Sequence, residues 1–252
     1  MRRELSEKEI LDTVRDIRHE APGIGAYKLY LMLKELYPDG MRGRDWFYGL
    51  MHESHLMLKL GKRRHTTSSS HPYRKYKNMI KGLTVNRINQ LWVADITYID
   101  TDEGVAYLHL LTDAFTHEII GWVLSDSLVA SNTVTALEMG ISHVSPLGFD
   151  GLIHHSDRGV QYCCNQYIDR LQAIKATISM TEDYKPTDNA IAERVNGIIK
   201  QEWLYRMKRP PDVVVARDLL GRIIGFYNNR RPQRSNRDML PPVRFREALT
   251  CM

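Results

Sequence analysis

Cysteine is scarce in this sequence, and long apolar runs are missing. The 252 residues include three cysteines. Two of them, Cys163 and Cys164, are adjacent and Cys251 is next to last, so they predict neither a disulfide framework nor a CxxC metal pair. We therefore expect a reducing, cytoplasmic environment. No apolar run approaches the ~18 residues that cross a bilayer, and the N-terminus lacks the apolar stretch of a secretory signal, so we expect no membrane partner.

Acidic residues are absent between Glu53 and Asp95. The net charge is +5, and residues 1–90 carry +8, which leaves −3 for residues 91–252. Clustered cations displace the counterions condensed on nucleic acid, so this basic arm (residues 59–87) is predicted to follow a polyanion. The alternative is a solvated linker that happens to be basic. The candidate DNA contacts within the arm are Lys62, Arg63, Arg64, Arg74, Lys75 and Lys77.

Three short helices are predicted before the arm. Residues 6–20 open with Ser6 and Glu9, the spacing of a capping box, and continue with apolar residues at helical intervals. Further helices are predicted over Ala26–Leu36 and Arg44–His55. Three short helices joined by tight turns match the outline of a helix-turn-helix unit, and the basic arm behind them favours DNA binding.

After the arm the pattern changes to alternating strands and helices. Strands are predicted over 91–99, 105–111, 119–124, 151–155 and 176–179, and helices over 132–143, 166–174, 190–205 and 213–227. The first three strands form a meander. This order predicts a mixed α/β architecture in which helices pack on a central sheet.

The stretch HHSDRGVQY (154–162) offers two histidines and an aspartate as candidate functional groups. A zinc site and a general-base histidine are two interpretations of this stretch. A third combines Asp157, directly after the fourth strand, with Asp95 in the middle of the first strand and Glu193 in the first turn of a helix. Each acid alone could be a solvated surface group, but a strand centre, a strand end and a helix start can converge at one sheet edge. Three such carboxylates suit Mg²⁺ or Mn²⁺, and two ions would support phosphoryl transfer.

Four motifs make the sequence similar to the integrase-core transposases of bacterial insertion sequences, specifically to the second-reading-frame product of the IS-three family. They are LWVADITYI (91–99), HHSDRGVQY (154–162), DNAIAERVNGIIKQEWL (188–204) and FYNNRRP (226–232). The 35 residues between Asp157 and Glu193 match the interval of the family's D,D(35)E signature, and 61 residues separate Asp95 from Asp157. Together with the N-terminal segment, the resemblance covers nearly the whole chain.

The resemblance implies a ribonuclease-H-like core over 91–230, preceded by a helix-turn-helix-like domain over 1–60 and a basic linker over 61–90, and followed by a basic tail over 231–252. It implies that Asp95, Asp157 and Glu193 bind two divalent ions and that the protein cleaves element ends and joins them to DNA. The implied partners are double-stranded DNA (terminal inverted repeats and target), further copies of the chain and the upstream-frame product as a fusion or partner. The implied location is the nucleoid-associated cytoplasm.

The sequence departs from the family at Gln233, where relatives commonly have histidine, and this could reduce activity. The main alternative is a non-catalytic DNA-binding regulator of transposition. A nuclease acting on RNA in hybrids is disfavoured by the basic arm, and a retroviral-type integrase by the missing N-terminal His/Cys zinc pattern.

Further contacts are predicted around the three acids. Asn196 and Lys200 lie three and seven residues after Glu193 and share its helix face. Lys200 and Arg158 are candidate phosphate contacts, as is Arg231 in the basic tail. Asp113 is interpreted as structural, and Asp188 or Asn189 as the cap of the helix that carries Glu193.

Overall fold

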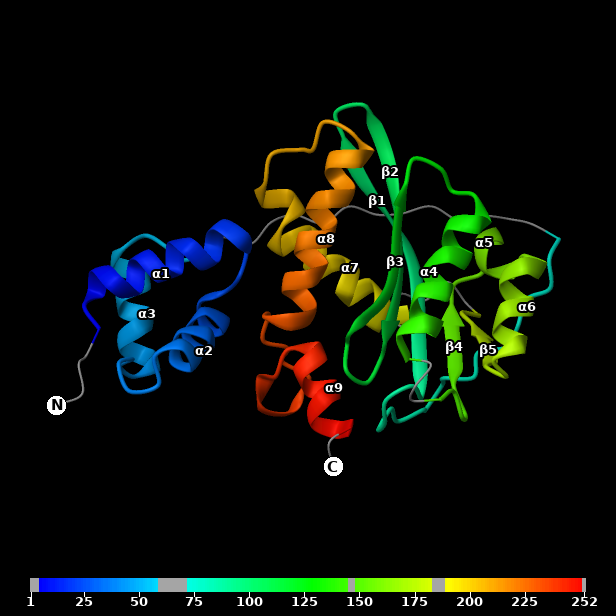
Figure 1. The fold of residues 1–252 in the computed structure, drawn as a ribbon, viewed down its shortest axis with the longest axis horizontal. Helices are drawn as coiled ribbons and strands as arrows, with labels where there is room; N and C mark the ends of the chain where they lie inside the picture. The colour runs from blue at the N-terminus through cyan, green and yellow to red at the C-terminus, as the bar shows by residue number, and fades with distance from the viewer. Residues whose placement is uncertain (1–4, 59–71, 145–147, 183–188, 251–252) are drawn as a thin grey trace.

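The computed structural model describes residues 5–58, 72–144, 148–182 and 189–250 (Figure 1). Three of the candidate DNA contacts, Lys62, Arg63 and Arg64, lie outside the described residues, as does the predicted cap Asp188. No helix in the described part of the chain is both long enough and apolar enough to cross a membrane.

The three predicted N-terminal helices are present as α1 (Glu7–Glu20), α2 (Ala26–Leu36) and α3 (Arg44–Glu53). The capping box is confirmed, because the backbone N–H of Glu9 donates to Ser6 Oγ at 3.3 Å and that of Ser6 donates to Glu9 Oε2 at 2.9 Å. The helix α3 ends two residues earlier than predicted, and His55 just beyond it adopts a φ of 54°. A left-handed residue cannot continue a right-handed helix.

The central sheet has the order β3-β2-β1-β4-β5. The strands β1 (Leu91–Thr101), β2 (Gly104–Asp113) and β3 (Ile119–Ser125) form the predicted antiparallel meander. The short strands β4 (Ile153–Ser156) and β5 (Thr177–Met180) add in parallel beside β1. This mixed sheet confirms the predicted ribonuclease-H-like class.

Helices cover both faces of the sheet (Figure 1). The helices α4 (Ala130–Val144), α5 (Val160–Cys163) and α6 (Asn165–Ala173) share a buried cluster with Trp92 and Ala94 of β1. The helices α7 (Ala190–Glu202) and α8 (Val213–Asn229) share another cluster with β2. Gly121 permits the close approach of α4, since a Cβ there would lie 2.0 Å from the carbonyl oxygen of Ala136.

The C-terminal region predicted as a basic tail folds into a further helix, α9 (Pro242–Thr250), after the short 3₁₀ turn η4 (Arg237–Met239). Phe245 packs on Phe115 with ring centroids 5.6 Å apart. Arg246 Nε donates to the buried carboxylate of Glu118 at 2.7 Å. Local sequence did not show this helix, because the surface that stabilises it lies on the distant β2–β3 connection.

The N-terminal helices dock on the C-terminal end of α7. The fully buried Trp203 donates from Nε1 to the carbonyl of Glu20 at 2.8 Å, and this residue also ends α7 earlier than predicted, before the 3₁₀ turn η3 (Leu204–Arg206). The backbone N–H of Gly23 donates to the carbonyl of Glu202 at 2.7 Å. Lys28 Nζ reaches the Glu202 carboxylate at 2.7 Å. The helical unit is therefore attached directly to the helix that carries Glu193.

The described end of the basic arm lies along the edge of the sheet. The backbone N–H of Met180 donates to the carbonyl of Lys77 at 3.3 Å, and that of Met79 donates to Ser179 Oγ at 2.8 Å. The backbone N–H of Asn78 donates to Glu182 Oε1 at 3.0 Å. This part of the arm therefore covers the edge strand β5, which would otherwise offer unpaired backbone groups.

Candidate active site

Two neighbouring parallel strands bring Asp95 and Asp157 to the same place. Along β1 and β4, Leu91 pairs with Ile153 and Val93 pairs with His155. The same offset, continued by two residues, places Asp157 opposite Asp95, and adjacent strands lie only ~4.8 Å apart. Asp157 comes directly after β4, as the sequence predicted.

The carboxylate of Asp95 is half-buried and has hydrogen-bond donors on both oxygens. The backbone N–H of Ile96 donates to Oδ1 at 2.9 Å, and Asn196 Nδ2 donates to Oδ2 at 2.7 Å. Burial and then the charge of Asp157 raise the pKa of Asp95 to about 7; the two hydrogen bonds oppose this rise, and Glu193 adds a smaller increase. The charges of Asp157, after β4, and of Glu193, on α7, therefore both act on the Asp95 carboxylate in β1.

Glu193 lies in the first turn of α7, and its side chain is exposed. Asn189 occupies the predicted N-cap position of α7, but its side chain makes no cap hydrogen bond in the described part of the chain. Its Nδ2 instead donates to the carbonyl of Ala94 at 3.0 Å. Asn189 thereby holds the start of α7 against β1, next to Asp95.

The loop that follows Asp157 shapes the rim of the site. The backbone N–H of Gly159 donates to Asp157 Oδ1 at 2.9 Å. Tyr162 is buried, and its hydroxyl has no hydrogen-bond partner among the described residues. Burial raises the pKa of Tyr162, and the charges of Asp157 and Asp95 raise it further. The hydroxyl therefore remains a neutral donor close to both carboxylates.

The two histidines of the HHSDRGVQY stretch belong to the core. His154 and His155 are buried in β4. His154 Nε2 lies 2.8 Å from the hydroxyl of Tyr167, and His155 Nδ1 lies 2.8 Å from Ser179 Oγ. Burial lowers the pKa of His154 to about 3. Both rings therefore support the strand that presents Asp157.

Over the described ranges, no three or more His, Cys, Asp or Glu side chains are arranged closely enough to hold a metal ion. The carboxylates of Asp157 and Glu193 each lie within electrostatic range of Asp95. Their donor chemistry, three hard oxygen ligands, fits Mg²⁺ or Mn²⁺. A divalent cation would also relieve the repulsion that raises the pKa of Asp95.

Two of the predicted DNA contacts lie near the loop of Asp157. Arg158 is half-buried, and its Nη1 donates to the carbonyl of Glu182 at 3.0 Å. Burial raises the pKa of Cys163 to about 11, and Asp157 adds to the rise, whereas Lys75 and Arg158 oppose it. The exposed Lys75 and the half-buried Arg158 therefore lie within electrostatic range of the same thiol as Asp157.

Three other predicted contacts have different surroundings. Lys200 is half-buried, and burial lowers its pKa. The charges of Asp95 and Asp100 oppose this, so its ammonium group lies within electrostatic range of Asp95. Arg74 is exposed and stacks over the Tyr76 ring at 4.9 Å. Lys77 is exposed beside the edge of β5.

The DNA contact predicted for Arg231 does not fit its position. Arg231 is only 3% exposed. Its Nε and Nη2 donate to the two oxygens of Glu202, each at 2.8 Å, and its Nη1 donates to Gln233 Oε1 at 2.7 Å. Gln233, the departure from the family pattern, also donates from Nε2 to Ser235 Oγ at 2.9 Å. Both residues therefore stabilise the fold in the interior.

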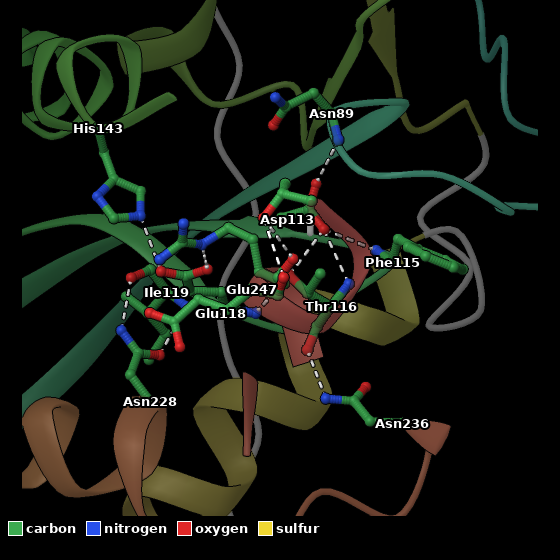
Figure 2. A network of polar contacts seen from close by, with 12 residues as sticks. Asn89, Asp113, Phe115, Thr116, Glu118, Ile119, His143, Asn228, Asn236 and Glu247 are labelled. Atoms are coloured by element: carbon green, nitrogen blue, oxygen red, sulfur yellow. Dashed lines mark hydrogen bonds and ion pairs between the residues drawn. The ribbon is translucent and has the colours of Figure 1, made fainter. Parts of the chain in front are cut away.

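The structural interpretation of Asp113 is confirmed. Figure 2 shows its carboxylate accepting hydrogen bonds from the backbone N–H groups of Asn89 at 2.9 Å, Phe115 at 3.1 Å and Thr116 at 2.8 Å. Asp113 is only 1% exposed, and burial raises its pKa. In the same network Glu118 lies 2.8 Å from His143 Nε2. These contacts fix the β2–β3 connection.

Comparison with known proteins identifies the class of this fold and site. The integrase core domain family matches residues 85–186, and a second integrase core domain family matches residues 174–242. The HTLV-2 integrase catalytic core domain in complex with magnesium aligns over 63% of this chain and 96% of that chain, with 17% identity and a TM-score of 0.48. The two family matches together give this chain an integrase core over residues 85–242.

Curated relatives identify the family within the integrase-core class. The transposase for insertion sequence element IS904 of Lactococcus lactis is 30% identical over 237 residues, which cover 89% of each chain. The transposase for insertion sequence element IS629 of Shigella sonnei is 33% identical over 173 residues, which cover 68% of this chain and 56% of that one. The chain thus spans little more than half the length of some relatives. It belongs to the insertion-sequence transposases, as its motifs predicted.

Proposed function

We propose that this protein cleaves the ends of an insertion sequence and joins them to DNA by divalent-metal-dependent phosphoryl transfer. The observation that supports the proposal is the raised pKa of Asp95, to which burial and the charges of Asp157 and Glu193 contribute. Family membership supports the same activity. In this mechanism no protein side chain acts as the nucleophile.

Asp95, Asp157 and Glu193 are the proposed ligands of two Mg²⁺ or Mn²⁺ ions. When bound, such ions supply positive charge at the attacking and leaving oxygens of a phosphodiester. Asp95 provides the deepest ligand, held by Ile96 and Asn196. Asp157, directly after β4, and Glu193, on α7, are exposed and would complete the ligand set.

The proposed substrate is double-stranded DNA, as terminal inverted repeats and as target. Lys75, Arg158 and Lys200 are the proposed phosphate contacts, and this is supported by the electrostatic interactions of Lys200 with Asp95 and of Lys75 and Arg158 with Cys163. Arg74, Lys77, Lys62, Arg63 and Arg64 are proposed as further DNA contacts, and the N-terminal helices as a further DNA-binding unit. We propose that the protein acts in the cytoplasm, associated with the nucleoid. Because two ends must be held together, the active form is proposed to be an oligomer, with the upstream-frame product as a fusion or partner.

The test is strand transfer by an Asp157→Asn variant, with labelled element ends, a target plasmid and Mg²⁺. The substitution keeps the shape of the side chain but removes a charged ligand. We expect a loss of joining of roughly 100–1,000-fold, on the order of what removing one electrostatic catalytic group costs, while DNA binding stays within about twofold. Asp169→Asn on the exposed side of α6 is the matched control and is expected to join normally.

The same experiment separates the enzyme from the non-catalytic regulator. If the Asp157→Asn variant still joined element ends to target DNA, the proposed role of the carboxylates would be wrong. DNA binding by the parent without any nicking or joining, in Mg²⁺ or Mn²⁺, would favour the regulator.

A further inference from the structure

We propose that Asn196 is a positioning residue of the carboxylate site, which orients Asp95 for the metal and sets the approach of α7 to β1. This inference rests on the proposed function. Asn196 Nδ2 donates to Asp95 Oδ2 at 2.7 Å, and Asn196 is only 5% exposed. Local sequence placed Asn196 on the same helix face as Glu193 but did not show what it contacts.

The two donors to Asp95 come from different elements. Ile96 belongs to β1 itself, so its N–H on Oδ1 follows from the local backbone. Asn196 belongs to α7, so its bond joins the helix to the strand through the carboxylate. An ionised carboxylate has about four lone-pair sites, and these two bonds leave the others for a cation. Outer hydrogen-bond partners of this kind orient metal-binding carboxylates in general.

A second contact ties the same helix to the adjacent residue of β1. Asn189 Nδ2 donates to the carbonyl of Ala94 at 3.0 Å. Glu193 lies four residues after Asn189 and three before Asn196, so it is held between two attachments. The start of α7 cannot tilt away from β1 without breaking one of them. The two amides therefore determine how closely Glu193 approaches Asp95.

The amide oxygen of Asn196 indicates that packing alone does not explain why this position holds an asparagine. Its Oδ1 is buried and has no hydrogen-bond partner among the described residues. A buried polar atom without a partner is unfavourable, and an apolar side chain would avoid it. Asn196 therefore serves the contact that its Nδ2 makes with Asp95.

The experiment is calorimetric titration of the full chain with Mn²⁺ in the absence of DNA. Asn196→Leu removes the donor at similar volume, and Asn196→Ala removes it without adding an apolar branch beside Asp95. We expect both variants to bind Mn²⁺ roughly 10–100-fold more weakly, as when an outer partner of a metal ligand is lost. Asn228→Leu is the matched control. It deletes the amide that bonds the backbone of Ile119, remote from the site, and is expected to leave Mn²⁺ affinity unchanged.

The outcomes separate this inference from the function on which it rests. Mn²⁺ affinity equal to that of the parent, in either folded variant, overturns the positioning role while leaving the proposed function intact. A parent that binds no Mn²⁺ overturns both. Weaker binding by the Asn228→Leu control to the same degree would also overturn the inference, because general loosening of the fold would then explain the loss.

Discussion

At the scale of single residues, Asp95 is where folding and the proposed activity conflict. Its carboxylate is half-buried in a strand and is repelled by Asp157 and Glu193. The pKa of about 7 in the folded chain lies above the ordinary value of 3.8. The stabilising contribution of Asp95 is therefore fully present below about pH 4 and is lost as the pH rises towards 7.

Asp95→Asn is predicted to stabilise the metal-free protein, increasingly so from pH 5 to pH 8. One pKa unit corresponds to about 1.4 kcal/mol, and partial exposure reduces the effect, so we expect a gain of roughly 1–3 kcal/mol at pH 8. The amide of Asn196 can turn to offer its Oδ1 to the new amide. Denaturant unfolding in a chelator at several pH values measures the gain, with Asp169→Asn as control. If the gain in the free energy of unfolding became smaller as the pH rises, the raised pKa of Asp95 would not be its cause.

At the scale of secondary-structure elements, α7 joins two sites. Its first turns carry Glu193 and Asn196, and its last residue, Glu202, binds Lys28 of the N-terminal helices and the buried Arg231. Burial raises the pKa of Glu202, but the bonds and charges of Arg231 and Lys28 outweigh it and leave the pKa below its ordinary value. The helical unit and the carboxylate site are therefore attached to one rigid helix.

Gly23→Ala is predicted to break this attachment. A Cβ at Gly23 would lie 2.4 Å from the Cα of Glu202 and 2.5 Å from its carbonyl oxygen, and neither backbone atom can move aside easily. Overpacking of this kind costs about 1–3 kcal/mol. We expect a lower midpoint of thermal unfolding and faster proteolysis between α1 and α2.

Gly25→Ala, two residues away, is the control for that variant. A Cβ at Gly25 meets nothing within 4 Å, so the midpoint of thermal unfolding of this variant is expected to be close to that of the parent. Equal stability of the two variants would show that the close approach of Gly23 to Glu202 does not hold the helical unit in place.

At the scale of the whole molecule, positive charge is concentrated in one part of a chain whose remainder is slightly acidic. The described end of the basic arm is fixed along β5, which brings Lys75 near the loop of Asp157. Residues 72–87 of the arm are therefore not a linker that is independent of the core. The arm is predicted to lead DNA to the carboxylates along this edge of the sheet.

Neutralising the arm is predicted to weaken DNA binding at every sequence and to reduce its salt dependence. Each lost phosphate contact lowers the slope of log affinity against log salt by about 0.9. The triple variant Lys62→Ala, Arg63→Ala, Arg64→Ala is expected to reduce the slope by about 2–3, and Lys75→Ala with Lys77→Ala by about 1–2. Fluorescence anisotropy over a salt series measures this, with Arg222→Ala on the exposed side of α8 as control. If the variants showed the same slope of log affinity against log salt as the parent, the arm would not contact DNA phosphates.

Local sequence was enough to predict most of the elements and the position of the three acids along the chain. The capping box of Ser6 and Glu9, the apolar β-branched strands and the acid at the end of β4 each depend on residues a few positions apart. Short-range sterics and hydrogen bonding determine such features, so they can be read from composition and spacing. The interval between Asp157 and Glu193 then led to the family and its expected site.

Only the tertiary structure decided which side chains support that site. Asn196 and Asp95 are separated by 101 positions, and Glu202 and Lys28 by 174. The sequence alone predicted Asn189 as a cap and Arg231 as a DNA contact, but distant carbonyl and carboxylate groups bind both. A buried polar side chain takes its partner from whatever the fold places beside it, and no local pattern records that neighbour.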